Sequence, residues 1–582
     1  MRLVHRSSSR VLGTALLCAA VVACALGVIA AITGGGRIHV LGIGLSARGP
    51  HRAFIIAAIL AALGLSAHTS ARDRLGRWLS RVPVRWSHAA AAALALVVVA
   101  LGLVYGTKAP AGADAYGYIS QADLWLAGDL RIPQPIVSEV PWPRAEWTFT
   151  PLGYRPDPDG TLVPVYAPGI PLLMAALKST FGPGAEYWLH SLCGALLVLS
   201  TYLLGTRLSG HGVGLVAALW TAASPLVLFL SLGLLGDLPA AAFWTLSLYL
   251  AMHGGASIAL GSGLAAASAV VIRPNLLPLA LIPAILAWSR SEPRTAARTI
   301  GLFASGVAMA VLFIAWLFAD LYGSPFVSGY GDSRQLFALG HIPVNLRQFA
   351  LWTWRSHGPM PFLFAAAVVG IPGGCERRTR LALIGFVLLV VVCYAAYLPF
   401  DEWWYLRFLL PGLPVAFILS TDAVWRLSQH ARPAGCFALR AGFVICAVGL
   451  SLYVTGERRV LESARTATRY EEAGHYVRDH LPANGIIYSM EHSGSIRYYS
   501  GRTTLRYDIL DPAWLDRSVE HLAARGYLTY LAIEAHEARR FRERFAGQRA
   551  LRALDGHLEE RDPQAMIIVP LTADSARRAP GR

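Results

Sequence analysis

The chain has 582 residues, of which 55% are hydrophobic and only 15% are charged, and its formal net charge is +16. Soluble domains carry about 25% charged residues, so this composition excludes an ordinary soluble protein. Several apolar runs, among them 11–32, 89–103 and 381–398, approach the roughly 20 residues that cross a bilayer. The sequence therefore predicts a polytopic α-helical membrane protein.

In chain order, hydropathy predicts about thirteen membrane-spanning helices. The first one follows a short basic segment and is longer than the h-region of a signal peptide, so we interpret it as a retained anchor. The predicted spans are 11–32, 53–68, 88–106, 186–205, 213–232, 239–253, 256–272, 276–289, 299–320, 359–373, 381–399, 408–425 and 437–455.

The basic charge is distributed unevenly over these spans. With the N-terminus in the cytoplasm, the cytoplasmic segments carry a net charge of +14, the opposite side up to residue 455 carries 0, and the rest of the chain carries +2. This bias is what the positive-inside rule describes, so the charge indicates topology, and nucleic-acid binding is not expected. The predicted parts are 1–87 (two extra spans and a basic cytoplasmic loop), 88–455 (a transmembrane core with outside loops 107–168 and 321–358) and 456–582 (an extracytoplasmic domain).

The segment from 456 onward is much more polar than the rest and is typical of a small α/β domain. Asp511 followed by Pro512 is a typical helix start, with an N-cap residue before a proline. The predicted strands are 485–490, 528–533 and 566–571, and the predicted helices are 468–481, 512–525 and 535–545. The cysteines and histidines show no metal-ligand spacing and no disulfide framework, so zinc chemistry has no support in the sequence.

The first outside loop contains Asp114, which precedes apolar residues at helical spacing. These residues predict an amphipathic helix along the membrane face, and loop 321–358 is predicted to contain a second surface-lying helix. Asp114 is either a helix N-cap or a carboxylate placed as a general base at the bilayer surface. Tyr166, followed by Pro168 and Gly169, introduces an apolar helix that is too short to span.

Three further charged residues lie at span ends on the same predicted side. Asp237 is costly at a membrane boundary, which suggests a role, although capping of the next helix is an alternative. Arg273 is either a ligand or a snorkelling arginine. Arg407 lies beside Glu402 and Tyr405 in a short aromatic loop, where a guanidinium suits a phosphate and the aromatic residues suit an interfacial belt.

Taken together, these stretches resemble the GT-C fold of lipid-linked-sugar-dependent membrane glycosyltransferases. The likeness is greatest to the bacterial family-39-like branch, which includes protein O-mannosyltransferases and lipid A aminoarabinose transferase. It is carried by Asp114-Ala-Tyr116-Gly-Tyr118 with Ala127-Gly128-Asp129 farther along, Tyr166-Ala-Pro168-Gly169-Ile170-Pro171-Leu172, Gly236-Asp237-Leu238-Pro239, Arg273-Pro274 and Tyr405-Leu406-Arg407-Phe408-Leu409-Leu410-Pro411.

The resemblance implies roles for these residues. Asp114 would position or deprotonate the acceptor nucleophile, Asp237 would be a second acidic residue of the active-site cavity, and Arg407 with Arg273 would bind the donor phosphate. The substrate-binding set is completed by Tyr116, Tyr166, Tyr405 and Glu402. Many relatives have a second acidic residue directly after the first-loop aspartate, whereas this chain has Ala115. A requirement for a divalent metal therefore stays open.

We therefore predict a glycosyltransferase that moves a hexose or pentose from a polyprenyl-phosphate-linked donor to an extracytoplasmic lipid, glycan or protein acceptor. The expected location is a bacterial plasma (inner) membrane, with the N-terminus cytoplasmic and both the active site and the C-terminal domain outside. One alternative is a transporter or flippase, which would place charges in mid-span and show internal repeats. Another is a non-catalytic scaffold that presents the C-terminal domain.

Overall fold

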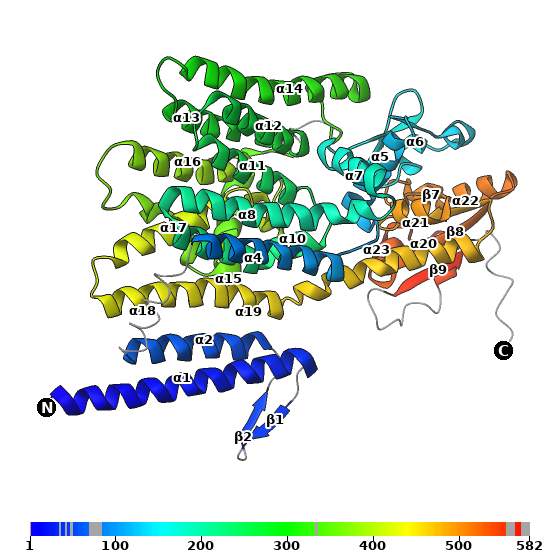
Figure 1. Ribbon diagram of the computed structural model, residues 1–582. Helices are drawn as coiled ribbons and strands as arrows, with labels where there is room; N and C mark the ends of the chain where they lie inside the picture. The colour runs from blue at the N-terminus through cyan, green and yellow to red at the C-terminus, as the bar shows by residue number, and fades with distance from the viewer. Residues whose placement is uncertain are drawn as a thin grey trace. The chain divides into compact units, whose positions relative to one another are not determined.

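The computed structural model describes residues 2–33, 37–40, 43–46, 50–68, 84–331, 334, 336–554 and 565–571 (Figure 1). The chain forms two compact units, each of which is described by itself. Unit 1 consists of Met1–Gly106, His190–Val311 and Arg334–Ser463, and unit 2 consists of Thr107–Leu189, Leu312–Ser333 and Ala464–Arg582. Most of the predicted basic cytoplasmic loop, 69–83, lies outside the described residues.

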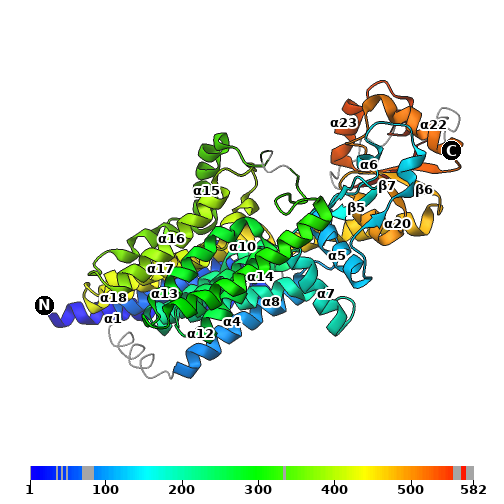
Figure 2. The ribbon, with the colours of Figure 1, turned by 90° about the horizontal axis from the view of Figure 1, so that it is seen from above.

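Among its described residues, unit 1 is helical apart from one β-hairpin, β1 Arg37–Val40 with β2 Ile43–Ser46. Several of its helices, among them α4, α8 and α12, follow a common direction (Figure 2). The α-helices that begin in this unit or at its edge are α1 Arg2–Thr33, α2 Pro50–Ala67, α4 Val84–Tyr105, α8 Leu189–Ser209, α9 His211–Ala223, α10 Pro225–Leu232, α11 Asp237–Ala251, α12 Ala256–Ile272, α13 Leu281–Ser289, α14 Ala296–Tyr322, α15 Ile342–His357, α16 Cys375–Ala395, α17 Leu413–Ser428, α18 Pro433–Val444 and α19 Leu450–Glu457. Shorter turns are η3 Pro274–Ala280, η5 Leu339–His341, η6 Met360–Val368, η7 Trp403–Leu409, the π-helical η8 Ile445–Gly449 and η9 Val460–Ala467.

Within the described residues, five helices are long and apolar enough to cross a membrane, and up to seven if each of two bent pairs is one span. The five are Val84–Tyr105, Ala185–Ser209, Ala296–Tyr322, Cys375–Ala395 and Gly435–His480. The polytopic helical class is therefore confirmed, whereas the predicted count of thirteen spans is not. Four of the other predicted spans correspond to shorter apolar helices, Val11–Leu26, Ile55–Leu65, Ala256–Ile272 and Pro274–Ser289.

The predicted span 359–373 is wrong as a membrane-crossing helix. Its ordered part is the nine-residue 3₁₀ helix η6, which starts beside Pro359 and contains Pro361. At about 2 Å of rise per residue, a 3₁₀ helix of this size covers roughly 18 Å, well short of a hydrocarbon core of about 30 Å. Hydropathy predicted a span because the segment is apolar, but the folded segment is too short to cross the bilayer.

Prolines also break two of the predicted spans into bent pairs. Between α9 and α10, Ser224 accepts a hydrogen bond from the Val227 amide and Pro225 occupies the first helical position, and the two helices meet at 57°. Between η7 and α17 the angle is 81°, at a break that contains Pro411 and Gly412. Proline lacks the amide hydrogen that would continue the ladder, so the chain restarts in a new direction.

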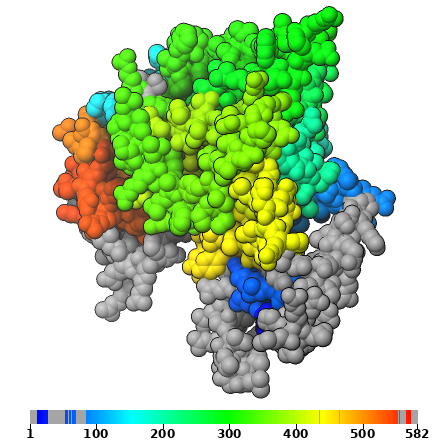
Figure 3. Space-filling view, turned by 90° about the vertical axis from the view of Figure 1, so that its left-hand side faces the viewer, coloured from blue at the N-terminus to red at the C-terminus, as the bar shows by residue number. Residues whose placement is uncertain are grey.

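The core of unit 1 centres on α17, whose residues from Leu413 to Ala423 are all buried. Trp220 of α9 stacks on Phe417 of α17 with ring centroids 3.9 Å apart. A helix that is apolar on every side is suited to this central place. On the outside of the unit, α18 packs against α2, and Figure 3 shows their yellow and blue atoms side by side.

Unit 2 combines the first long loop with the C-terminal segment. The loop contributes α5 Gly112–Leu126, β3 Ile132–Pro133, η1 Pro135–Glu139, α6 Ala145–Thr148, β4 Tyr154–Pro156, β5 Thr161–Pro164, α7 Gly169–Phe181 and η2 Ala185–Trp188. Its three strands form an antiparallel sheet in the order β3-β5-β4. The helices predicted after Asp114 and after Pro168 are thus present as α5 and α7.

The C-terminal segment is a small α/β fold, as predicted. It contains α20 Thr468–His480, β6 Gly485–Tyr488, α21 Ser493–Ser500, β7 Thr503–Leu505, η10 Pro512–Trp514, α22 Leu515–Ala524, β8 Leu528–Glu534, α23 Ala535–Arg544, η11 Arg549–Leu554 and β9 Met566–Pro570. The sheet order is β7-β6-β8-β9, with β6 parallel to both β7 and β8, and β9 antiparallel to β8. The three predicted strands and three predicted helices are confirmed, and Asp511 caps η10.

Candidate functional site

Two arginines converge on one buried carboxylate in unit 1. Asp237, only 2% exposed, is the first residue of α11, and Arg273 directly follows α12. Because α11 and α12 pack against each other through a short connection, the start of one meets the end of the other. Arg273 Nη2 donates to Asp237 Oδ2 at 2.8 Å, and Arg407 Nε lies 3.5 Å from the same oxygen.

These contacts decide between the alternative roles that the sequence left open for Asp237 and Arg273. The N-cap of α11 is Gly236 and makes no side-chain cap bond, and the Asp237 carboxylate contacts the two guanidinium groups. The interpretation of Asp237 as a simple helix cap is therefore wrong. Arg273 forms a short ion pair, so it is not merely a snorkelling arginine.

Aromatic rings surround the Arg407 guanidinium. Its central carbon lies 4.9 Å from the Trp404 ring centroid, 5.1 Å from that of Tyr405 and 5.3 Å from that of Phe408. Phe400 stacks on Tyr405 at 4.0 Å and nearly parallel, which fixes that ring in place. The predicted aromatic loop is therefore an ordered enclosure around one guanidinium, and cation–π attraction stabilises it there.

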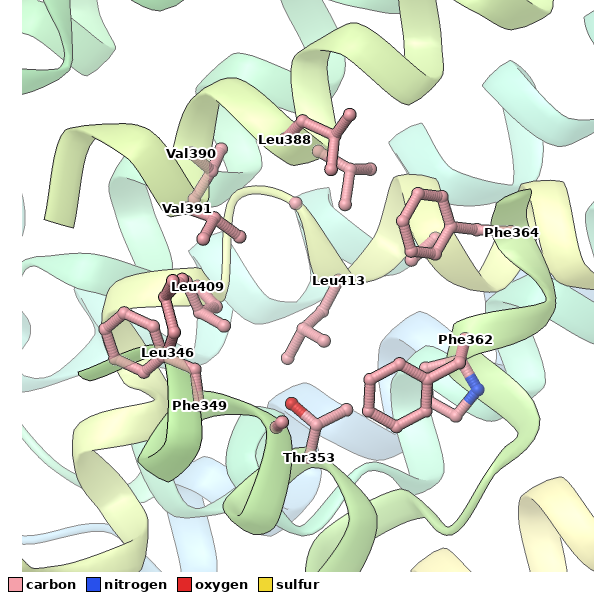
Figure 4. A pocket seen from close by; sticks show the side chains of 15 residues that line it. Leu346, Phe349, Thr353, Phe362, Phe364, Leu388, Val390, Val391, Leu409 and Leu413 are labelled. Atoms are coloured by element: carbon pink, nitrogen blue, oxygen red, sulfur yellow. The ribbon is translucent and has the colours of Figure 1, made fainter. Parts of the chain in front are cut away.

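An apolar cavity of about 190 Å³ lies next to this loop. Side chains from α15, η6, α16 and the start of α17 point into it, and Figure 4 shows Phe349, Phe362, Val391 and Leu413 around the space. Leu409, two residues after Arg407 on η7, is also part of the wall. The only side-chain hydroxyl among the lining residues is that of Thr353. Such a cavity accepts a hydrocarbon and excludes a polar ligand.

Asp114 belongs to unit 2, where it lies in the first turn of α5 rather than before the helix. The N-cap is Ala111, so the N-cap alternative for Asp114 is wrong. Tyr166 forms a side-chain hydrogen bond with Asp114. Burial, together with the negative charge of Asp114, raises the pKa of Tyr166 well above 10, so the phenol stays protonated and donates to the carboxylate.

Tyr166 is held in place by close packing. Its ring lies 4.8 Å from the Tyr118 ring and 6.0 Å from the Tyr330 ring. A Cβ at Gly117 would lie 2.2 Å from the Tyr166 ring, so the glycine is what lets the ring reach this position. The motif residues around Asp114 thus serve to fix one hydrogen-bonded carboxylate.

Three other predicted substrate-binding residues have different surroundings. Tyr116 is buried in a cluster with Tyr154 and Leu162, and its ring packs on Gly494 of α21. Burial raises its pKa. Glu402 is exposed at the N-cap of η7, whereas Tyr405 forms part of the Arg407 enclosure.

The structure therefore brings together Asp237, Arg273, Arg407 and Tyr405 in unit 1, and Asp114 with Tyr166 in unit 2. One charged residue of unit 2 that the sequence did not single out is Arg497 of α21. It is partly buried beside Tyr116 and Tyr154, donates to the Phe149 carbonyl at 3.0 Å, and has a pKa lowered by desolvation. No local motif marks it, because its partners lie more than 300 positions away.

No protein-family model matches the sequence, and no curated protein matches it. Solved structures do match. An oligosaccharyltransferase from Archaeoglobus fulgidus, tethered to an acceptor peptide containing the NVT sequon, superposes with a TM-score of 0.52 at 12% identity, over 79% of this chain and 70% of that chain. ArnT from Cupriavidus metallidurans, bound to undecaprenyl phosphate, gives 0.51 at 13% identity, over 84% and 99%. These likenesses show that the chain has a fold similar to GT-C membrane glycosyltransferases.

Proposed function

We propose that the chain is a membrane glycosyltransferase, of the family-39-like branch of the GT-C fold, that uses a polyprenyl-phosphate-linked sugar. One observation carries the proposal: two guanidinium groups converge at the helix ends beside an apolar cavity. A polyprenyl-phosphate sugar combines one phosphate with a long hydrocarbon, so it suits both features at once.

The charges in this cluster match a phosphodiester. Arg273 and Arg407 contribute two positive charges and Asp237 one negative charge, so the cluster has a net charge of +1. The donor phosphodiester carries one negative charge, and the leaving phosphate gains a second one as its bond to the sugar breaks. Guanidinium groups oriented in advance stabilise that developing charge more than they stabilise the ground state.

The apolar cavity is the proposed place for the first isoprene units. Leu409 of its wall and Arg407 of the phosphate site are neighbours on η7, so a lipid seated in the cavity presents its headgroup to the arginine. Support comes from ArnT of Cupriavidus metallidurans, a protein of similar fold whose structure contains undecaprenyl phosphate.

Asp114 is the proposed general base. In the reaction, the acceptor oxygen forms a bond to the anomeric carbon, the bond between that carbon and the phosphate oxygen breaks, and its electron pair stays on the phosphate. The acceptor proton passes to the Asp114 carboxylate, which the Tyr166 phenol orients through its hydrogen bond. The acceptor is a lipid, glycan or protein on the extracytoplasmic side, where the positive-inside bias favours the catalytic loops and the C-terminal domain.

The test uses the full chain in lipid nanodiscs with radiolabelled polyprenyl-phosphate sugars and envelope extract as acceptor. Asp114→Asn is expected to lower sugar transfer at least about 100-fold while donor binding stays within about twofold, as for loss of a general base. The matched control is Asp129→Asn, an exposed aspartate of the same loop. Transfer by Asp114→Asn equal to that of the control would overturn the assignment.

Two further measurements address the rest of the proposal. Arg407→Gln is expected to weaken donor binding, because the phosphate loses a charge-assisted contact of about 1.5–3 kcal/mol. An alkaline phosphatase fused to the C-terminus is expected to be active, and an inactive fusion would contradict the outside placement. If the wild type transfers no sugar but moves the labelled lipid from one leaflet of a proteoliposome to the other, the protein is a flippase and the proposed transfer is wrong.

A further inference from the structure

The C-terminal sheet contains a crossover point at which open α/β sheets bind ligands. From β6 the chain runs through α21 to β7 on one side, and from β7 it crosses through α22 to β8 on the other side of β6. The strands β6 and β8 are parallel neighbours, so their carboxyl ends lie together where the strand order reverses. Ligands of such sheets bind outside the carboxyl ends at this place.

Four polar side chains follow these two strand ends. Glu491 and His492 come after β6, Glu534 is the last residue of β8, and His536 is the second residue of α23. His536 Nδ1 lies 3.3 Å from Glu534 Oε2, and His536 Nε2 lies 3.4 Å from Glu491 Oε1. One ligand atom each from Glu491, Glu534 and His536 lie within 4.8 Å of one another.

The Glu534 carboxylate is fully buried, and its two oxygens differ. Oε1 accepts a hydrogen bond from His492 Nε2 at 2.8 Å and forms an ion pair of 2.8 Å with Arg469 Nε. The carboxylate also accepts a hydrogen bond from the Glu537 amide at the start of α23. Oε2 lies 3.3 Å from His536 Nδ1 and has no hydrogen-bond partner among the described residues. A buried carboxylate oxygen without a donor is costly, so this oxygen is suited to a ligand.

The charges also favour a cation. Glu491 and Glu534 carry two negative charges, and Arg469 supplies one positive charge from the Oε1 side. The side chains of Glu491, Glu534 and Arg469 therefore sum to a net charge of −1 around the buried Glu534 carboxylate. A divalent cation at Oε2 would reverse that charge and occupy the side opposite to Arg469.

We propose that Glu491, Glu534 and His536 form a binding site for a divalent transition metal of the zinc class. One imidazole nitrogen and two carboxylate oxygens are the donor set that suits this class, whereas Mg²⁺ prefers oxygen alone. The ligand atoms of one tetrahedral ion, at about 2.0–2.2 Å from it, lie roughly 3.3–3.6 Å apart. One atom from each of the three side chains already lies within 4.8 Å of the others, so they would close in on an ion by about 1 Å. Three protein ligands leave a fourth position for water or a substrate oxygen.

His492 is a positioning residue in this site. It is fully buried, stacks on Tyr470 at 4.1 Å and donates to the Glu534 oxygen that does not face the cluster. Hydrogen bonds of this kind orient metal ligands and commonly change affinity by about 10–100-fold. The His536 side chain is 46% exposed and that of Glu491 is 32% exposed, so a metal can enter from solvent.

The test measures Zn²⁺ binding to the full chain in nanodiscs by equilibrium dialysis. The seven cysteines are free thiols, so they are alkylated first to remove competing sites. Wild type is expected to bind one Zn²⁺ more than the double variant Glu491→Gln/His536→Ala. Each single variant is expected to bind that ion at least about tenfold more weakly, and excess Mg²⁺ is not expected to displace it.

The matched controls are exposed residues of the same domain, His480→Ala at the end of α20 and Glu543→Gln on α23. Both are expected to bind Zn²⁺ like wild type. Co²⁺ in place of Zn²⁺ is expected to give the visible absorption of a four-coordinate nitrogen and oxygen site in wild type and not in Glu491→Gln. Equal stoichiometry in wild type and the double variant, or unchanged affinity in His536→Ala, would overturn the proposal. It does not depend on the proposed glycosyl transfer.

Discussion

The charge cluster around Asp237 predicts that the effect of Arg407→Gln on the free energy of unfolding changes sign when Asp237 is replaced by asparagine. Asparagine has nearly the same shape as aspartate, so Asp237→Asn leaves no cavity and mainly removes a charge. That carboxylate is 2% exposed and contacts Arg273 at 2.8 Å and Arg407 at 3.5 Å. A unit-charge pair at 4 Å is worth about 4 kcal/mol at an effective dielectric constant near 20, before desolvation is subtracted.

Loss of one partner from a buried ion pair typically costs about 3–5 kcal/mol, because the other charge stays buried. Asp237→Asn leaves the buried Arg407 and the partly buried Arg273 without their carboxylate, so we expect the free energy of unfolding to fall by about 3–5 kcal/mol. Arg407→Gln alone is expected to destabilise the wild type by about 1–3 kcal/mol. In the Asp237→Asn background the same substitution removes the repulsion between two cations, so it is expected to stabilise the protein.

The assay is denaturant unfolding in detergent micelles, followed by circular dichroism, for the wild type, the two single variants and the double variant. The control is Asp401→Asn, an exposed aspartate of the aromatic loop, which is expected to unfold like wild type. The reasoning is refuted if Asp237→Asn lies within about 0.5 kcal/mol of wild type. It is also refuted if the effects of Asp237→Asn and Arg407→Gln add, since residues in contact should couple by about 0.5–3 kcal/mol.

Three further predictions concern packing, pH and the lipid cavity. In Gly263→Ala the new Cβ would lie 2.3 Å from the Phe303 carbonyl oxygen, so the free energy of unfolding should fall by about 1–3 kcal/mol. In the control Gly261→Ala the nearest atom lies at 3.7 Å, so thermal unfolding should show the stability of the wild type. Burial raises the pKa of Glu537 above its ordinary 4.5. The protonated carboxyl therefore contributes its whole stabilisation below pH 4.5, and this stabilisation is lost as the pH rises through the pKa of the folded state. Glu537→Gln should flatten that decline in unfolding curves recorded over a series of pH values. Ala350 lies at the wall of the apolar cavity, so Ala350→Phe should weaken binding of a polyprenyl phosphate about tenfold, or about 1.4 kcal/mol, in a titration. The control Val344→Phe lies on the same helix outside the cavity and should bind the lipid like wild type.

Helix positions were predictable where an apolar segment is continuous and its ends are polar or helix-breaking. The predicted span 256–272 coincides with α12, because Gly255 precedes it and Pro274 follows closely. The error at 359–373 has the opposite cause. Hydropathy measures apolar content but not rise per residue, and the prolines there favour a short 3₁₀ turn that cannot cross a bilayer.

The pairing of site residues was predictable in part. Asp237 and Arg273 begin and end a pair of adjacent helices, so the sequence places them on one side of the membrane, and the structure adds the contact between them. The contact with Arg407 depends on how η7 folds back before α17, which no spacing in the sequence encodes.

The C-terminal metal-ligand group was missed for a similar reason. Zinc motifs in a sequence are marked by histidine and cysteine pairs, whereas the local signal here is a glutamate and a histidine two positions apart at a strand end, Glu534 and His536. The third ligand, Glu491, comes from another strand and becomes visible only when β6 and β8 are known to be parallel neighbours.

A second buried carboxylate in unit 1 helps to explain why the Asp237 cluster is the better candidate for a ligand. Asp422, near the far end of α17, also contacts two arginines, Arg380 at 2.8 Å and Arg426 at 3.2 Å. There the guanidinium groups also donate to protein oxygens, those of Ser209 and the Val369 and Ala367 carbonyls. Hydrogen bonds of this kind tie helix ends together.

At the other end of α17, three aromatic faces lie around the Arg407 guanidinium, and an apolar cavity begins at Leu409. Aromatic faces stabilise a cation without accepting its N–H groups in well-directed hydrogen bonds. An anion with a hydrocarbon tail complements such surroundings, whereas it would have to displace existing hydrogen bonds around Asp422. The same ratio of one carboxylate to two arginines therefore serves helix packing at one end of α17, and at the other end it forms the proposed site for a lipid phosphate.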